Sequence, residues 1–448
     1  MQVHGLSARG FRNLAGITLS PHPRFNVLSG ENGQGKTNIL EAIYLIATLR
    51  SFRTLRTEEL IQFGEPNAEL RARVQHRDVQ RALGVRLETR PTKKVALVDG
   101  KQASGSEYFG AVNVVLFAPE DLRLPKGPPV GRRRFLDRAI WNTLPAYLDE
   151  VRTYDRVLRS RNALLRQDLR SALDKRRPGH AHAHAEPHAD GQADGPAAGA
   201  VADTTADTTA DGGGIASAAP APAAATLPSS LELLDIFDEK LADAGAVLMR
   251  RRHAYVRELL PEARGAFAEV SRSGLAIDLR YQPGVSASQR EAALAVAEDA
   301  RGLRALLHEQ LKRDRRRDLI RGYTHSGPHA DDLALDLDGR PADQHASQGQ
   351  LRAIVLSLKI AEIQHLGRHL GDPPVLLLDD VSSELDPQRN GYLFEFLRSV
   401  PCQVFITTTS ASFVQLGHAP GGDGGGGDSD RRDYQVAGGQ VEPIASTH

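Results

Sequence analysis

One octapeptide near the N-terminus limits the folds open to this chain: Gly30-Glu31-Asn32-Gly33-Gln34-Gly35-Lys36-Thr37, which satisfies G-x-x-x-x-G-K-[ST]. The apolar run Phe25 to Leu28 precedes it, and residues 38–49 with helix-like apolar spacing follow it. Between a strand and a helix, such glycines let backbone N–H groups turn onto phosphate oxygens, and the helix dipole favours the same anion. The sequence therefore predicts a phosphate-binding loop, with a glycine turn and a solvated lysine as the alternative.

The residues of this loop are expected to make different contacts with a bound nucleotide. Lys36 is expected to reach the β- and γ-phosphates and to act in catalysis, and the Thr37 hydroxyl is expected to hold Mg²⁺. The other six residues of the octapeptide are predicted to contact ATP. Arg12 follows a strand-like run, and the strand pattern over residues 15–20 then leads into the loop, which places an arginine next to the nucleotide.

Length and composition set wide limits on the rest. The 448 residues are long for a single core, so two lobes are expected, and the 56 basic and 56 acidic residues give zero formal net charge. The one cysteine, Cys402, suits a reducing compartment. The N-terminal residues show no signal or transit pattern, and no apolar run approaches 18 residues. We therefore expect a cytoplasmic protein with no membrane partner.

The pattern along the chain predicts an ATPase lobe in two halves, residues 1–130 and 271–448, separated by a helical lobe at 131–270. The first half contains alternating strands between residues 69 and 98 that predict an antiparallel sheet. Near the C-terminus, a glycine-rich tail segment is expected to be flexible. One charged helix from about Ser286 to Ile320 is expected to return the chain to the first lobe.

Within the helical lobe, residues 171–230 are rich in Ala, Gly, Pro, Asp and Thr and predict a disordered insert between two helices. Four histidines in this insert are candidate metal ligands: His180, His182, His184 and His188. Flexible His-Ala spacing without cysteine or carboxylate partners is more often inert, so both interpretations stay open.

A second nucleotide motif lies near the C-terminus. The segment Pro374 to Asp380 is a continuous apolar strand that ends in two carboxylates, as a buried parallel strand ends at a ligand site. Asp379 is predicted to hold Mg²⁺, and Asp380 to orient or deprotonate the attacking water. The alternative is a strand end followed by acidic turn residues.

A third motif, Ser347-Gln348-Gly349-Gln350, directly precedes a helix-like run over residues 351–366. Small and polar residues at a helix N-terminus form an anion-binding surface. In the order phosphate loop, Ser-x-Gly-Gln, acidic strand and Ser383-Glu384-Leu385-Asp386, the motifs match the ABC-type ATPase head. In that class, the serine signature of one protomer covers the nucleotide of the other, so Ser347, Gly349 and Gln350 are predicted to bind ATP across a dimer.

The predicted fold class is accordingly α/β: an ABC-type P-loop ATPase lobe with mixed sheets and an inserted helical lobe, without a long coiled coil. Further motifs resemble the RecF DNA replication and repair family, a relative of SMC-type heads. They are Phe11-Arg12-Asn13, Arg50-Ser51-Phe52-Arg53, Gly131-Arg132-Arg133-Arg134-Phe135-Leu136-Asp137 and Gly327-Pro328-His329-Ala330-Asp331-Asp332-Leu333. Ala330 departs from the pattern, which has arginine there. Glu120 and Thr409 are positional candidates for the missing Q-loop glutamine and switch histidine.

The resemblance implies an ATP-dependent DNA-binding protein that dimerises on ATP at gapped or junction DNA. It also implies help in loading recombinase onto single strands together with the RecO and RecR proteins, with slow, DNA-stimulated ATP hydrolysis. The residues encode DNA binding only weakly. Candidate phosphate contacts form three clusters, each of which could instead be a solvated helix face: 132–134, 250–252 and 312–317.

Two other classes of protein share part of the pattern. A transporter ATPase subunit carries the same nucleotide motifs, but the helical lobe with its arginine clusters and the missing Q-loop glutamine disfavour it. A P-loop kinase needs neither the Ser-x-Gly-Gln motif nor a dimer driven by ATP.

Overall fold

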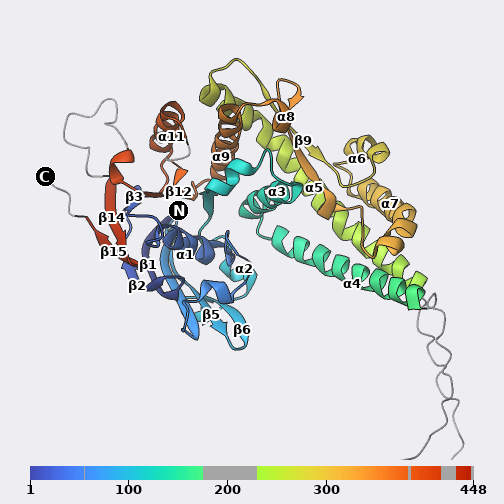
Figure 1. Ribbon diagram of the computed structural model, residues 1–448, viewed down its shortest axis with the longest axis horizontal. Coiled ribbons are helices and arrows are strands. Elements are labelled where there is room, and N and C mark those ends of the chain that lie inside the picture. The colour runs from blue at the N-terminus through green and yellow to red at the C-terminus, as the bar shows by residue number, and fades with distance from the viewer. Residues whose placement is uncertain (55, 175–229, 382–384, 415–429, 445–448) are drawn as a thin grey trace, which may run out of the picture.

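The computed structural model describes the chain except for residue 55 and residues 175–229, 382–384, 415–429 and 445–448 (Figure 1). Three predictions fall wholly or partly in these gaps and lie outside the described residues. They concern the insert with its four histidines, the flexible glycine-rich tail segment, and the pair Ser383-Glu384.

A six-stranded sheet in the order β15-β14-β3-β13-β12-β8 forms the centre of the first lobe. Every neighbouring pair is parallel except β14 with β15. Its strands are β3 (Phe25–Ser29), β8 (Val114–Phe117), β12 (Val375–Asp379), β13 (Val404–Thr408), β14 (Arg431–Ala437) and β15 (Gln440–Pro443). All residues of β3 and β12 are buried, as expected for strands covered on both faces.

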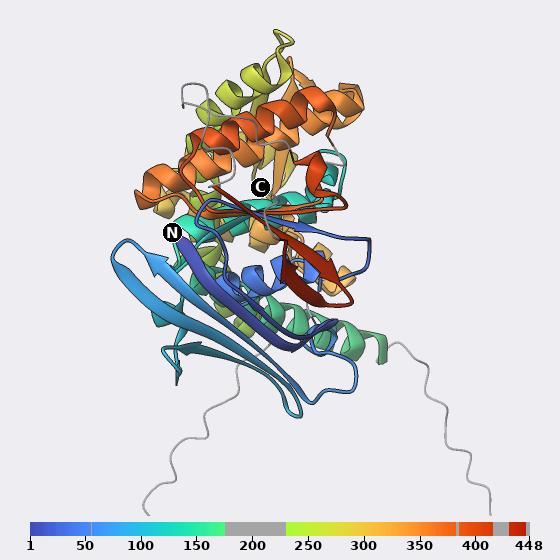
Figure 2. The same ribbon diagram turned by 90° about the vertical axis from the view of Figure 1, so that its left-hand side faces the viewer.

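An antiparallel sheet in the order β2-β1-β4-β5-β6-β7 lies below the central sheet in Figure 2. Its strands are β1 (Gln2–Phe11), β2 (Leu14–Leu19), β4 (Asn67–His76), β5 (Val79–Thr89), β6 (Thr92–Val98) and β7 (Lys101–Gln102). Helix α1 (Lys36–Thr48) contacts both sheets and has 11 buried residues. A helix packed on two sides has little surface exposed to solvent, which explains why most residues of α1 are apolar.

Helices cover the opposite face of the central sheet. Along β12, Val375 and Leu377 join the core around α1, whereas Leu376 and Leu378 join the core with the helices. The helices of that second core include α3 (Pro129–Thr143), α9 (Gln348–Leu370) and α11 (Pro387–Ser399). Alternate residues of β12 thus pack against different layers, one on each face of the central sheet.

The helical part extends to the right in Figure 1. It contains α4 (Tyr147–Asp174), α5 (Ser230–Ser271), α6 (Arg290–Ala295) and α7 (Ala300–Arg321), with a small sheet of β9 (Ile277–Gln282), β10 (Asp332–Leu337) and β11 (Arg340–Pro341). The single helix predicted over 286–320 is wrong, because the backbone leaves helical geometry after α6 and Asp299 caps a new helix. Helix α7 packs against α4 and α5 rather than returning the chain to the first lobe.

Short elements complete the described chain: α2 (Gly105–Tyr108), α8 (Ala342–His345), η1 (Glu58–Leu60), η2 (Pro119–Arg123), η3 (Ala287–Gln289), η4 (Pro328–Ala330) and η5 (Ala411–Phe413). None of the helices in the described ranges is both long and apolar enough to cross a membrane.

Candidate nucleotide-binding site

The phosphate loop joins β3 to α1 at the carboxyl edge of the parallel strands, where α/β sheets bind ligands. Gly30 and Gly35 have φ angles of 152° and 115°, which side chains rarely tolerate. A Cβ atom at Gly30 would lie 2.2 Å from the carbonyl oxygen of Val436, and one at Gly35 would lie 2.9 Å from Oδ1 of Asn13. Glycine is therefore required at both positions by conformation and by space.

Lys36 is the first residue of α1, and its ammonium bends back over the loop. Its Nζ donates to the carbonyl oxygens of Gly30 at 2.6 Å and Glu31 at 2.8 Å. Burial lowers the pKa of Lys36, and the nearby carboxylates of Asp380 and Asp379 oppose that shift. The cation is thus centred on the loop and electrostatically coupled to the two acids at the end of β12.

Thr37 and Asp379, the two residues that the sequence predicts as Mg²⁺ ligands, are in contact. The Thr37 hydroxyl donates to Oδ1 of Asp379 at 2.8 Å, although 342 positions separate the two residues. Asp379 is buried, and burial raises its pKa while the hydrogen bonds from Thr37 and Thr407 oppose the rise. A hydroxyl and a carboxylate in contact are oxygen donors of the kind that Mg²⁺ prefers, so the residues fit that ion.

Thr407 is a site residue that the sequence interpretation missed. Its hydroxyl donates to Oδ1 of Asp379 at 2.8 Å and accepts from the backbone N–H of Asp380 at 2.9 Å. β13 pairs with β12 in parallel, so both strands end at the same edge. Thr409, the positional candidate for the switch histidine, lies two residues further along the chain and is exposed.

Asp380 follows β12 with φ of 49°, a left-handed conformation that is unusual for a residue other than glycine. This turn ends the strand directly beside the phosphate loop. Glu120 raises the pKa of Asp379 through its charge, which places the predicted Q-loop candidate within electrostatic range of the site.

Arg12 and Gln34 are held by other parts of the protein. Both oxygens of the Glu41 carboxylate accept from the Arg12 guanidinium, at 2.8 and 2.9 Å. Gln34 accepts hydrogen bonds from the backbone N–H groups of Gly438 and Gly439 in the β14–β15 turn, at 2.7 and 3.0 Å. No sequence motif marks this hairpin, because its short strands follow a glycine-rich segment and resemble the residues of a tail.

The Ser-x-Gly-Gln motif forms the N-terminus of α9. Ser347 Oγ accepts from the backbone N–H of Gln350 at 3.2 Å, and the Gln350 side chain accepts from the backbone N–H of Ser347 at 2.8 Å. This capping box leaves Ser347 exposed. The motif follows α8, which Figure 1 shows well away from the start of α1.

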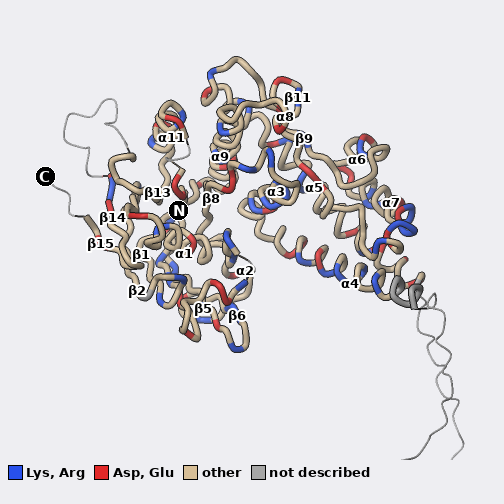
Figure 3. The backbone as a smooth tube through the Cα atoms, in the orientation of Figure 1, with Lys and Arg blue, Asp and Glu red and all other residues tan. Residues whose placement is uncertain are grey.

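Six of the arginines in the predicted DNA-contact clusters bond to oxygens of this chain. Arg132 donates to both oxygens of Asp332, at 2.7 and 2.9 Å, and Arg252 is buried against Asp331 at 2.7 Å. Arg133, Arg251, Arg313 and Arg315 also bond to oxygens of this chain. Figure 3 shows basic residues interspersed with acidic ones along the helices. Arg132 and Arg252 are largely buried in these contacts, whereas Arg313 and its partner Glu309 are more than half exposed. The structure therefore assigns an internal role to Arg132 and Arg252.

The motif at residues 327–333 is largely part of the same internal network. Asp331 is buried and accepts from Tyr281 at 2.5 Å and from the backbone N–H of Gly284 at 2.7 Å. His329 bonds to the Tyr154 hydroxyl at 2.6 Å. Ala330, the departure from the family pattern, is exposed.

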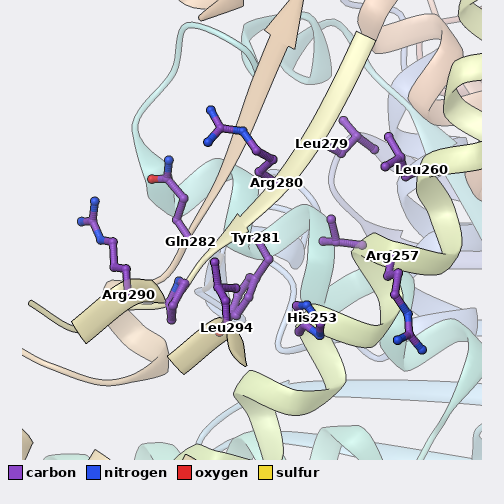
Figure 4. Close-up of a pocket in the computed structure, with 11 residues that line it drawn as sticks. His253, Arg257, Leu260, Leu279, Arg280, Tyr281, Gln282, Arg290 and Leu294 are labelled. Carbon is purple, nitrogen blue, oxygen red and sulfur yellow. The ribbon is translucent and has the colours of Figure 1, made fainter. Parts of the chain in front are cut away.

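Two of the cavities outside the phosphate loop are lined by several arginines. One of about 380 Å³ lies between residues 50–54 and helices α3 and α4, and Arg50, Arg53, Arg134 and Arg138 are among its lining residues. The other, of about 450 Å³, lies between α5 and β9. Figure 4 shows Arg257, Arg280 and Arg290 around it; no predicted site residue lines it.

Comparisons with known proteins agree with the class and refine it. The family model described as "RecF/RecN/SMC N terminal domain" matches residues 2–421. The chain is 40% identical over 449 residues to the "DNA replication and repair protein RecF" of Anaeromyxobacter sp. (strain Fw109-5), with 100% of both chains covered. It is 39% identical to the protein of that name from Myxococcus xanthus (strain DK1622), covering 93% of this chain and 92% of the relative.

Among solved structures, the chain is similar to one described as "the recombination mediator protein RecF-ATPrS". The TM-score is 0.75 at 27% identity, and 99% of this chain and 98% of that chain are covered. The parallel core with its phosphate loop, together with this similarity, defines an ATPase head of the ABC type. Within that class, the chain belongs to the RecF family.

Proposed function

We propose that this protein is an ATP-dependent, DNA-binding recombination mediator in DNA replication and repair. The observation that carries the proposal is the contact of Thr37 with Asp379 in one chain, while Ser347 stands exposed at the start of another helix. The names of the similar proteins support the DNA replication and repair assignment. Family membership also favours this function over a transporter ATPase subunit.

The residues of the phosphate loop and those at the end of β12 each have a proposed role in ATP hydrolysis. Lys36 neutralises the β- and γ-phosphates, and Thr37 with Asp379 holds the Mg²⁺ that supplies further charge neutralisation when bound. Asp380 orients the attacking water, since its backbone turns next to the loop. Arg12 acts indirectly in this proposal, because its guanidinium bonds to Glu41 of α1, the helix that follows the phosphate loop.

ATP acts as a clamp between two copies of the chain in this proposal. Ser347, Gly349 and Gln350 of one copy cover the nucleotide held by the other, so the binding energy of ATP favours the dimer. Hydrolysis then releases the partner. Gapped or junction DNA, the RecO and RecR proteins and a cytoplasmic location complete the proposal, with slow hydrolysis stimulated by DNA.

The dimer is tested by Ser347→Arg. This substitution should leave ATP binding by the monomer near the wild-type value and abolish the dimer that forms with ATP, as measured by sedimentation velocity. Ser104→Arg is the matched control, because Ser104 is also exposed and also caps a helix through a capping box. A stable ATP-bound dimer of Ser347→Arg would refute the role of the signature.

DNA phosphates are proposed to bind beside the 380 Å³ cavity, where Arg50, Arg53 and Arg134 gather. Arg134→Ala should weaken binding to duplex DNA. It should also make the fall of log affinity with log salt concentration less steep, by about 1 in the slope. Arg316→Ala on α7 is the control, since it removes an equally exposed arginine. A larger effect of Arg316→Ala than of Arg134→Ala would contradict this location and indicate that DNA binds at α7.

A further inference from the structure

A cluster of metal-ligating side chains lies where α5 crosses α9, away from the phosphate loop. It consists of Glu258 on α5 and His365 and His369 on α9. The histidines are four residues apart and so lie on one face of the helix. One ligand atom from each of the three residues lies within 4.8 Å of the other two.

Both imidazole rings direct one nitrogen at the same carboxylate oxygen. Nε2 of His365 lies 3.8 Å from Oε2 of Glu258, and Nε2 of His369 lies 3.7 Å from the same oxygen. Nδ1 of His369 bonds to the His365 carbonyl oxygen at 3.1 Å. This acceptor keeps the proton of His369 on Nδ1 and leaves the lone pair on Nε2 directed at the cluster.

The surroundings suit a cation that keeps access to solvent. The side chain of His365 is 3% exposed, whereas those of His369 and Glu258 are 46% and 48% exposed. The Tyr255 ring packs edge-on against His365, with centroids 5.1 Å apart. Burial, with a smaller contribution from His369, lowers the pKa of His365 to about 4.

We propose that Glu258, His365 and His369 bind a divalent transition metal ion, Zn²⁺ foremost, that cross-links α5 to α9. Two imidazoles and a carboxylate form one of the donor sets that zinc uses, and water completes the fourth position on the exposed side. Donors about 2.0–2.1 Å from a tetrahedral ion lie roughly 3.3 Å apart, so the two 3.7–3.8 Å separations need only a small contraction.

This site differs in chemistry from the one at Thr37 and Asp379. Imidazole nitrogens favour zinc over Mg²⁺, which prefers oxygen ligands. A plain ion pair between histidine and glutamate is the competing explanation for the cluster. A direct ion pair would bring a ring nitrogen within hydrogen-bond distance of the carboxylate, but the two separations from Glu258 are 3.8 and 3.7 Å.

The test measures metal bound to the full-length chain. After dialysis against Zn²⁺, the wild type should retain one zinc per chain more than His369→Ala or Glu258→Gln does, with affinity lowered at least about 10-fold in each variant. Both substitutions fall on half-exposed side chains, so folding should survive. Substitution with Co²⁺ should give the visible absorption bands of a tetrahedral site in the wild type only.

Two controls separate this site from other histidines. His345→Ala removes an exposed histidine from α8 and should change nothing. A variant with alanine at His180, His182, His184 and His188 tests the insert as the source of binding. Zinc and cobalt signals that persist in His369→Ala, or that vanish with the insert histidines, would overturn the proposal, as would a wild type that binds neither ion.

Discussion

Asp379 receives two hydroxyl groups on a single oxygen atom. Thr37 comes from the phosphate loop and Thr407 from the neighbouring strand, both at 2.8 Å. Hydrogen bonds to an ionised acceptor are stronger than neutral ones, and here they offset part of the cost of burying the carboxylate, whose pKa stays raised. The acid that is proposed to hold Mg²⁺ is therefore oriented by the protein before any ion arrives.

Thr407→Val tests this orientation with almost no change of side-chain volume. The substitution removes the donor to Asp379 and the acceptor for the Asp380 N–H, so hydrolysis should slow by roughly 10-fold or more while ATP affinity changes little. Steady-state ATPase rates and nucleotide titrations measure the two effects.

Thr408→Val is the control for that substitution. Thr408 is the next residue of β13, and its hydroxyl bonds at 3.1 Å to the carbonyl oxygen of Ser410, away from Asp379. If both variants hydrolyse ATP at the same rate, the contact of Thr407 with Asp379 has no part in the reaction.

At the level of elements, strands and helices with strong local patterns could be predicted. Residues 25–28 and 374–380 carry near-continuous apolar runs, and both form central strands. The break near Asp299 and the β14–β15 hairpin could not be predicted. The first depends on a helix cap within an otherwise helical pattern, and the second depends on pairing with β3, some 400 positions earlier.

The candidate site shows the same division. The octapeptide and the acidic strand are motifs, so Lys36, Thr37 and Asp379 could be identified from the sequence. Thr407 belongs to no motif, and only the parallel pairing of β12 with β13 brings it to Asp379. The internal role of Arg132 likewise depends on Asp332, which lies 200 positions away.

Three helices of the helical part share one buried cation. Arg161 on α4 donates to Asp238 on α5 at 2.6 Å and to Asp318 on α7 at 2.7 Å, and all three side chains are fully buried. Arg161→Ala would leave two carboxylates buried without this cation. We expect a loss of about 3–5 kcal/mol in the free energy of unfolding, measured by urea denaturation.

Arg304→Ala is the matched substitution for comparison. Arg304 on α7 also pairs with two acids of α5, Glu239 and Asp243, but these three side chains are 42–60% exposed. Its removal should cost less than about 1 kcal/mol. Equal losses for Arg161→Ala and Arg304→Ala would show that burial of the triad carries no special stabilisation.

At the scale of the whole molecule, the reactivity of Cys402, the one cysteine of the sequence, can report whether the central sheet opens to solvent. It is 2% exposed and lies two residues before β13 of the central sheet. Burial raises the pKa of its thiol to about 11, with Arg24 opposing part of the shift. Because only the thiolate reacts, the folded protein should resist alkylation at pH 8.

The expected pH dependence has a definite sign. A raised pKa means that the alkylation rate of the folded protein keeps increasing with pH up to about 11, whereas the unfolded chain in urea levels off above about 8.5. At pH 8 the folded rate should be at least about 100-fold lower. Mass spectrometry after iodoacetamide treatment measures both rates; comparable rates would mean that the central sheet opens readily.

The β14–β15 turn holds Gln34 in the phosphate loop, and β3 has β13 on one side and β14 on the other. All of these partners lie beyond residue 400, so a ribosome must add more than 360 residues after the loop before the loop can take its final shape. Until then, the apolar β3 and α1 lack the strands that cover them. The nascent chain thus carries an unfinished nucleotide site during that part of its synthesis, a period in which chaperones rather than ATP would protect it.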